Sequence, residues 1–189
     1  MIKVKEISKS FGAKKVLENI SFDIEKGKPL FIAGKSGIGK TTFINIILGL
    51  EKADSGVIEG METLKKAVMF QEDRLCENIS AVKNIKITCK KSESEIKKAF
   101  ERVGFNNEDM FKPVKNLSGG MKRRVSFVRC MLYDGEFIIM DEPFKGLDTE
   151  TKRLCQNFLK ENISNKYCLI ITHDLTLPNV IGGKLMNLK

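Results

Sequence analysis

A glycine-rich stretch at residues 34–41, GKSGIGKT, offers the clearest chemistry in this sequence. A short apolar run at 29–33 precedes it and predicts a buried strand, and a helical pattern follows at 42–48. Strand, glycine-rich loop and helix in this order are the setting of a phosphate-binding P-loop, whose backbone N–H groups surround phosphate oxygens. In such a loop Lys40 supplies charge to the β- and γ-phosphates, and Thr41 offers its hydroxyl to Mg²⁺. The alternative is an incidental glycine-rich turn, and the flanking strand and helix argue against it.

Two carboxylates follow a second apolar strand pattern in the segment FIIMDEP, residues 137–143. Asp141 is placed to complete a Mg²⁺ shell, and Glu142 to accept a proton from the water that attacks a γ-phosphate. Taken alone, an acidic pair after a strand is also typical of an ordinary solvated loop. Beside a P-loop, the pattern favours the catalytic interpretation.

Two further polar residues end apolar strand patterns. Gln71 stands in VMFQEDRL, and His173, the only histidine, stands in LIITHD. Each by itself is more typical of a structural residue than of a functional one. Together with the acidic pair, however, they place polar groups at several strand ends, which form the ligand-binding edge of a parallel sheet.

A second candidate anion site lies at residues 116–124, NLSGGMKRR, at the head of a predicted helix. Ser118 can cap free backbone N–H groups, and Gly119 and Gly120 allow a phosphate to approach closely. The P-loop is already a better phosphate site. The sequence therefore raises the question of why one small protein carries two.

The order of the predicted elements indicates an α/β fold. Half-exposed strands are expected at 2–7 and 16–24, and a helix with cap serines at 92–103. The remaining patterns predict strands at 56–59, 66–70, 137–140 and 167–172 and helices at 119–132 and near 150–159. The alternation favours a P-loop NTPase with a mainly parallel sheet, a small N-terminal antiparallel β part and an inserted helical sub-domain at about 76–116.

Length and composition are those of one folded domain spanning 1–189. The chain has 33 Lys and Arg against 24 Asp and Glu, a formal net charge of +9. The basic residues are spread along the chain, with mild concentrations at 83–98 and 122–124, and aromatic residues do not interleave with them as a base-stacking surface would require. We therefore expect a solvated basic surface and no nucleic-acid partner.

The apolar runs, such as 44–50 and 168–171, are too short to cross a bilayer, and the N-terminus lacks the apolar segment of a signal peptide. Both features predict a cytoplasmic protein. The five cysteines form no CxxC pair and no metal-ligand spacing, so we expect them to be reduced and mostly buried.

The motifs taken in order resemble the nucleotide-binding subunit of ABC transporters over essentially the whole chain. Those motifs are GKSGIGKT, Gln71, LSGGM, FIIMDEP, Gly146-Leu147-Asp148 and His173. A P-loop alone is compatible with many NTPases. LSGG followed by MDEP, GLD and THD at these spacings is highly specific, and the variants FQEDRL, LSGGM and MDEPF are similar to importer ATPases of the nitrate, sulfonate and taurine group.

The resemblance implies ATP as ligand and Mg²⁺ as cofactor. It implies that Gln71 contacts Mg²⁺ and takes part in coupling to a membrane partner. It also implies that Glu142 is the catalytic base and that His173 contacts the γ-phosphate. Phe11 falls where the family stacks an aromatic ring on adenine, with a core phenylalanine as the alternative. The implied phosphate-binding residues are Gly34, Lys35, Ser36, Gly37, Gly39, Lys40, Thr41 and Thr42.

The resemblance also answers the question of the second anion site. Family members pair head to tail, as homodimers or heterodimers, and the LSGG segment of one closes over ATP held by the P-loop of the other. Ser118, Gly119 and Gly120 would then serve a partner's nucleotide, and Asp148 would lie in a loop between the subunits. Membrane-spanning subunits are the other implied partner, which would place the protein on the inner face of the cell membrane.

Two departures from the family pattern stand out. Met121 replaces the usual glutamine of the signature. Only 31 positions separate Lys40 from Gln71, so we expect a reduced adenine-side β part, and only 16 residues follow His173, so we expect no regulatory C-terminal domain. A soluble ABC-type ATPase in cofactor assembly is the main alternative to transport. A regulatory module without turnover is a third hypothesis, disfavoured because Lys40, Glu142 and His173 are all present.

Overall fold

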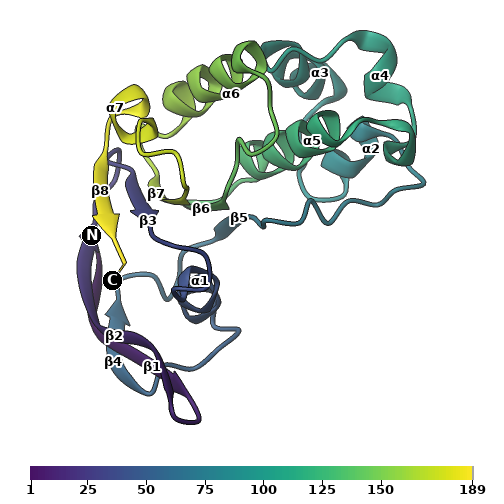
Figure 1. Ribbon diagram of the computed structural model, residues 1–189. Coiled ribbons are helices and arrows are strands. Elements are labelled where there is room, and N and C mark those ends of the chain that lie inside the picture. Colours follow the sequence, from purple (N-terminus) through teal and green to yellow (C-terminus); the bar gives the residue numbers. More distant parts are fainter. Residues whose placement is uncertain (189) are drawn as a thin grey trace.

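A five-stranded sheet forms the centre of the molecule in a computed structural model that describes residues 1–188 (Figure 1). Its strand order is β5-β6-β7-β3-β8, and every neighbouring pair is parallel. The inner strands β3, β6 and β7 are buried along their whole length, as their continuously apolar sequences require in a sheet covered on both faces. The strands are β3 (Leu30–Ala33), β5 (Lys66–Met69), β6 (Phe137–Asp141), β7 (Tyr167–Ile171) and β8 (Lys184–Asn187).

A smaller antiparallel sheet lies beside the first, with strand order β2-β1-β4. Its strands are β1 (Ile2–Phe11), β2 (Lys14–Ile24) and β4 (Ser55–Glu59). The predicted α/β class, the mainly parallel sheet and the antiparallel N-terminal part are thereby confirmed. Between the end of α1 and β5, β4 is the one strand that the structure describes.

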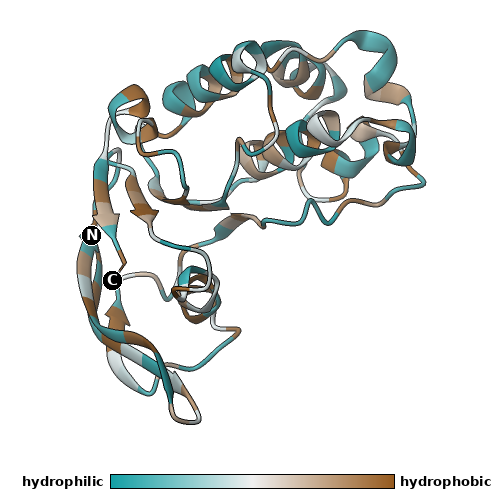
Figure 2. Ribbon diagram, viewed as in Figure 1, coloured by the Kyte–Doolittle hydropathy of each residue, from teal (hydrophilic) through white to brown (hydrophobic). Residues whose placement is uncertain are grey.

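Helices cover both faces of the parallel sheet. Figure 1 shows α1 (Lys40–Leu48) on one side, and α5 (Gly119–Leu132) and α6 (Thr149–Asn162) on the other. Helix α1 buries its apolar side chains against residues of both sheets. Figure 2 shows β3 largely brown, whereas α6 carries teal residues as well, which matches a strand buried on both faces and a helix buried on one.

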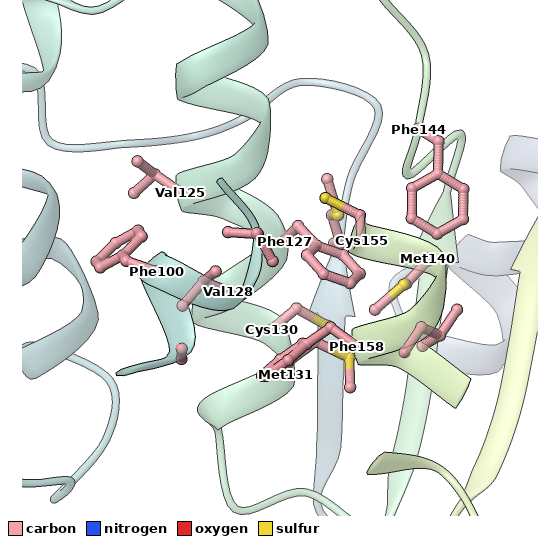
Figure 3. Packing of buried hydrophobic residues seen from close by; sticks show 14 of the residues in the cluster. Phe100, Val125, Phe127, Val128, Cys130, Met131, Met140, Phe144, Cys155 and Phe158 are labelled. Carbon is pink, nitrogen blue, oxygen red and sulfur yellow. The ribbon is translucent and has the colours of Figure 1, made fainter. Parts of the chain in front are cut away.

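Aromatic and sulfur-containing side chains pack on the face of the parallel sheet that α5 and α6 cover. Phe127 of α5 lies 5.7 Å from Phe144 and 6.2 Å from Phe158 between ring centroids. Figure 3 shows these rings meeting Cys155 and Met140, so that α5, α6 and β6 share one cluster. This packing fixes α5 relative to the carboxyl end of β6.

Short helices occupy the segment between β5 and α5 (Figure 1). They are α2 (Ala81–Lys86), α3 (Glu93–Arg102), α4 (Asn107–Phe111) and the 3₁₀ turn η1 (Val114–Asn116). Ser80, Ser92 and Asn106 each cap one of them, and Ser92 forms a full capping box with Glu95. Repeated caps divide the helical pattern into separate short helices, of which α2 and α3 pack on α5 and α4 packs on α2 and α3.

Two elements near the C-terminus were not predicted from the sequence. Helix α7 (Leu177–Ile181) is short, and β8 is a four-residue edge strand whose side chains are mostly exposed. Neither carries a clear periodic pattern, and β8 is specified by its pairing with β3. No helix within residues 1–188 is long and apolar enough to cross a membrane.

The cysteines follow the expectation in part. Cys130, Cys155 and Cys168 are buried, Cys89 is half-buried and Cys76 is exposed, and all five are free thiols. Burial raises the pKa of Cys130 and of Cys155 to about 12, so these two thiols stay protonated and act as small hydrophobic side chains.

Candidate active site

The carboxyl ends of the parallel strands meet at one edge of the sheet, and a cleft of about 390 Å³ lies there. Residues from β1, β2, the glycine-rich loop, α1 and the segments that follow β5, β6 and β7 line it. The lining residues are Phe11, Lys14, Val16, Ser36, Gly37, Gly39, Lys40, Thr41, Thr42, Gln71, Asp141, Glu142, Lys145 and His173. The structure therefore brings together most of the residues that the sequence analysis singled out from distant motifs.

The glycine-rich loop leads into α1 through Gly39, whose φ of 107° places it in a region that favours glycine. A Cβ added to Gly39 would lie 2.8 Å from both Cγ1 and the carbonyl oxygen of Val16, so β2 leaves no room for a side chain. No side chain caps α1, and its first turn carries no acidic residue. Its free N–H groups and positive dipole end are therefore available to an anion, as phosphate binding requires.

Lys40 is held inside the loop. Its ammonium donates hydrogen bonds to the carbonyl oxygens of Gly34 at 2.6 Å and Lys35 at 2.9 Å, and its side chain is buried. Within the described residues no carboxylate lies at salt-bridge distance from Lys40. Because a buried cation usually has an anionic partner, this environment fits a phosphate ligand. Gly34 and Lys35 are thus placed where their carbonyls position Lys40.

The acidic pair lies at the end of β6. Burial raises the pKa of Asp141 above its ordinary value, and the positive charges of Arg123 and Lys40 oppose this shift. Burial likewise raises the pKa of Glu142, which His173 partly counteracts. Glu142 has a φ of 51°, in the left-handed region that a glutamate rarely adopts, so its backbone is strained at the site.

The side chain of Glu142 lines the cleft, and one of its carboxylate oxygens lacks a hydrogen-bond partner within the protein. It is only 12% exposed, and its Oε1 has no hydrogen-bond partner although it is buried. Nε2 of His173 lies 3.5 Å from that oxygen. A buried carboxylate oxygen without a partner is costly, and it is the kind of group expected to accept a proton or a water molecule from a ligand.

Phe11 and Gln71 lie at the mouth of the cleft. Phe11 ends β1 and is 50% exposed, so the alternative of a core phenylalanine is wrong. Lys9 places its ammonium 5.1 Å from the centroid of the Phe11 ring. Gln71 follows β5 closely and is exposed. Its side chain is therefore free to contact a ligand.

The LSGG residues are not in this cleft. Ser118 caps α5 by accepting a hydrogen bond from the backbone N–H of Met121 at 3.2 Å. Gly119 is open to solvent, Gly120 lies beside Gly146, and none of them lines the cleft. Asp148 is exposed, and its Oδ1 caps α6 by accepting a hydrogen bond from the backbone N–H of Thr151 at 2.9 Å. Within one chain, therefore, the structure keeps the two candidate anion sites apart.

The residues of this cleft could supply only part of the coordination shell of a magnesium ion. No group of three or more His, Cys, Asp or Glu suited to a metal ion occurs within residues 1–188. Mg²⁺ is usually bound through one or two carboxylates together with phosphate oxygens and water. Thr41, Gln71 and Asp141 all line the cleft, and this set of oxygen donors fits that mode of binding.

Several lining residues escaped the sequence analysis. Lys14, Val16 and Lys145 belong to no motif, and only tertiary folding brings them to the cleft.

Arg123 was assigned to a solvated basic surface, and this was wrong because its side chain is buried. Its spacing of four from Phe127 places it on the buried face of α5, and this is the signal that could have revealed it.

A larger cleft, of about 840 Å³, lies near the opposite edge of the sheet. Its lining includes five lysines but none of the candidate site residues. The lysines are Lys65, Lys86, Lys90, Lys91 and Lys166. We therefore take the smaller cleft at the carboxyl edge as the candidate active site, because its lining residues carry the chemistry that the sequence motifs predict.

Comparison with known proteins is consistent with this geometry. A family model described as "ABC transporter" matches residues 17–145. The lantibiotic transport ATP-binding protein SrtF of Streptococcus pyogenes is 32% identical over 178 residues, which are 87% of this chain and 77% of that protein. The aliphatic sulfonates import ATP-binding protein SsuB of Corynebacterium glutamicum is 32% identical over 182 residues, 92% of this chain and 74% of that protein.

A solved structure supports the fold. The structure described as the dimeric structure of MJ0796, a bacterial ABC transporter cassette, superposes with a TM-score of 0.86 at 23% identity. The match covers 100% of this chain and 94% of that one. The chain therefore belongs to the ABC transporter family. Within that family it is an ATP-binding subunit with ATPase activity, as the motif resemblance predicted.

Proposed function

We propose that this chain hydrolyses ATP at the cleft on the carboxyl edge of its sheet and thereby drives transport through separate membrane-spanning subunits. One observation carries the proposal: P-loop, acidic pair, Gln71 and His173, which are far apart in sequence, line a single cleft. Relatives named for transport of lantibiotics and import of sulfonates support the role in transport. Because those two named substrates differ at equal identity, neither is assigned to this chain.

The glycine-rich loop would bind the phosphates. The uncapped N–H groups of α1 and the ammonium of Lys40 supply donors and positive charge, and Ser36, Gly37 and Thr42 line the same surface. Phe11, exposed at the cleft mouth, is placed to stack on the adenine ring. These roles follow from placement and from the chemistry of the donors.

Thr41, Gln71 and Asp141 would hold Mg²⁺ together with phosphate oxygens. When bound, Mg²⁺ neutralises charge on the phosphate oxygens. Glu142 would accept a proton from the attacking water, since its partnerless Oε1 is buried and burial raises its pKa toward neutral pH. His173, more than half exposed and close to Glu142, would contact the γ-phosphate.

The LSGG segment would complete the site of a second subunit. Ser118, Gly119 and Gly120 lie at the exposed start of α5 and do not reach the cleft of their own chain. A head-to-tail pair would place them over the partner's ATP, with the exposed Asp148 loop between the subunits. In this arrangement each nucleotide is held by two chains.

The Glu142→Gln variant tests the catalytic assignment. It keeps the shape of the side chain and removes the base, so the ATPase rate should fall roughly 10²- to 10⁴-fold while Mg²⁺-dependent ATP binding persists. Phosphate release and equilibrium nucleotide binding measure the two properties. The exposed Glu18→Gln serves as control and should hydrolyse ATP at the wild-type rate. Wild-type turnover by Glu142→Gln would rule out Glu142 as the base.

Partners recovered from membranes would test the transport role. We expect multi-span membrane subunits to co-purify with the chain at the cytoplasmic face of the membrane. Stable association with soluble assembly proteins instead would favour the alternative, a non-transport ATPase in cofactor assembly.

A further inference from the structure

Arg123, on the second turn of α5, connects two segments of the active site. Its Nη1 donates to the carbonyl oxygens of Phe70 at 2.9 Å and Gln71 at 3.0 Å, and to Oδ1 of Asp73 at 3.0 Å. Its Nη2 donates to the carbonyl oxygens of Asp141 and Glu142, both at 2.6 Å. One buried guanidinium therefore holds the segment after β5 and the end of β6 together.

The position of Arg123 follows from the geometry of the sheet. Strands β5 and β6 are paired up to Met69 and Met140. Beyond that pair the two segments no longer bond to each other, and backbone carbonyls that turn inward need other donors. The planar fork of a guanidinium can serve two segments at once, whereas the ammonium of a lysine has three donors on one atom.

The peptide units that Arg123 holds carry the side chains that act on the ligand. Gln71 and Glu142 both line the cleft, and their own carbonyls accept hydrogen bonds from Arg123. Fixing these carbonyls fixes the separation of the two Cα atoms from which the side chains project. Glu142 needs such support because its left-handed backbone is strained.

Resting on the proposed function, we propose that Arg123 is a positioning residue for ATP hydrolysis, which sets Gln71 and Glu142 relative to each other and to α5. It does not touch the cleft, so it acts through these two residues. Since Ser118 begins the same helix five residues earlier, Arg123 also ties the LSGG segment to the catalytic base of its own chain.

Arg129 provides a matched control on the same helix. Its Nη2 donates to the carbonyl of Asp73 and its Nη1 to that of Arg74, both at 2.8 Å. It thus ties α5 to the segment after β5, as Arg123 does, but the structure gives it no bond to Gln71, Asp141 or Glu142. Comparing the two variants separates general anchoring of this segment from positioning of the catalytic pair.

The first experiment compares Arg123→Gln, Arg123→Lys and Arg129→Gln in the full chain. Arg123→Gln should lower kcat roughly 10- to 100-fold, the effect of misplacing a catalytic group by about 1 Å. KM for ATP should stay within about threefold, because the P-loop is untouched. Arg123→Lys should fall between Arg123→Gln and the wild type, and Arg129→Gln should keep kcat within about threefold. Equal losses in Arg123→Gln and Arg129→Gln, or wild-type kcat in Arg123→Gln, would overturn the proposal.

Amide hydrogen exchange in the nucleotide-free chain gives a readout without activity. Arg123→Gln should speed exchange in peptides covering both 70–73 and 141–143, whereas Arg129→Gln should affect the first peptide only. Unchanged exchange at 141–143 in Arg123→Gln would contradict the proposal. Arg123→Lys, which retains the charge, supplies the same comparison if Arg123→Gln fails to fold.

A double-variant cycle identifies the route of action. If Arg123 works through Glu142, Arg123→Gln should cost little further single-turnover rate once Glu142 is already Gln. A full additional loss would show that Arg123 acts elsewhere. Failure of the proposed function looks different, since Glu142→Gln would then keep the wild-type rate. The loss of the positioning role would leave the effect of Glu142→Gln intact.

Discussion

Glu142 combines three features that are each unfavourable for folding. They are a left-handed backbone conformation, a buried carboxylate side chain and a carboxylate oxygen without a hydrogen-bond partner. Each of these features lowers the stability of the nucleotide-free chain. Such costs are typical of catalytic residues, whose placement serves the bound state rather than the folded protein alone.

The first prediction concerns stability and pH. Burial raises the pKa of Glu142 in the folded chain above its ordinary value of 4.5, so the ionised form favours the unfolded chain. The group therefore lowers the free energy of unfolding above its folded-state pKa, and this effect disappears as the pH falls below about 4.5. Glu142→Gln should raise Tm by a few degrees at pH 8, and the gain should shrink toward pH 4.5.

Thermal unfolding of the nucleotide-free chain at several pH values checks this prediction. Glu18→Gln, at an exposed position of β2, is the control and should show no such pH-dependent gain. A destabilised Glu142→Gln at pH 8 would mean that the carboxylate gains more from its surroundings than it loses by burial.

At the scale of elements, the start of α1 depends on how closely β2 approaches the glycine-rich loop. Gly39 and Gly37 both have positive φ, 107° and 77°. An added Cβ would collide with Val16 at Gly39, but would meet nothing within 4 Å at Gly37. The two glycines therefore differ in steric environment although they serve the same loop.

The second prediction follows from this difference. Gly37→Ala should cost about 1–2 kcal/mol of folding free energy, the penalty for a left-handed residue with a side chain. Gly39→Ala should cost about 1–3 kcal/mol more, because the backbone of β2 cannot move away freely, and it should also weaken ATP binding by shifting the first turn of α1. Urea unfolding and nucleotide titration measure both effects. Equal costs in the two variants would indicate that the loop relaxes away from Val16.

The helical segment between β5 and α5 also depends on local signals. Ser92 and Glu95 form a capping box, and the hydrogen bonds to Ser92 lower the pKa of Glu95 to about 2. The predicted helix at 92–103 accordingly agrees with α3 to within a residue at each end. The neighbouring helices α2 and α4 are too short to show periodicity, and their caps and their packing define them.

At the scale of the whole molecule, the cleft and the LSGG segment lie in different places within one chain. The start of α5 has no side chain in the cleft, and Gly119 is open to solvent. A single chain therefore presents one complete set of phosphate-binding groups and one set without a ligand of its own. The proposed head-to-tail pairing would use both sets, since each chain would then supply what the other lacks.

The third prediction tests this pairing. In the Glu142→Gln background, where hydrolysis is slow, Mg²⁺ and ATP should convert the chain from monomer to dimer, measured by analytical ultracentrifugation. Adding Ser118→Arg should abolish the dimer, because a large charged side chain would occupy the space of the partner's nucleotide. ATP binding to the P-loop should survive.

Ser92→Arg is the matched control, since it removes the N-cap of α3 outside the proposed interface and should leave dimerisation intact. A dimer that forms equally well with and without ATP, or that tolerates Ser118→Arg, would contradict the head-to-tail arrangement.

The sequence alone determined those features that local chemistry encodes. Glycines and the lysine of the P-loop, the apolar strands, the polar residues at strand ends and the capped helices could be read from residue type and spacing, and they predicted the fold and the candidate residues of the site. Tertiary structure decided what depends on contacts between distant segments. It placed Phe11 at the mouth of the cleft, Val16 against Gly39, and Arg123 where its guanidinium donates to the backbone carbonyls of Gln71 and Glu142. It also formed β8, whose sequence carries no strand pattern, because pairing with β3 satisfies its backbone.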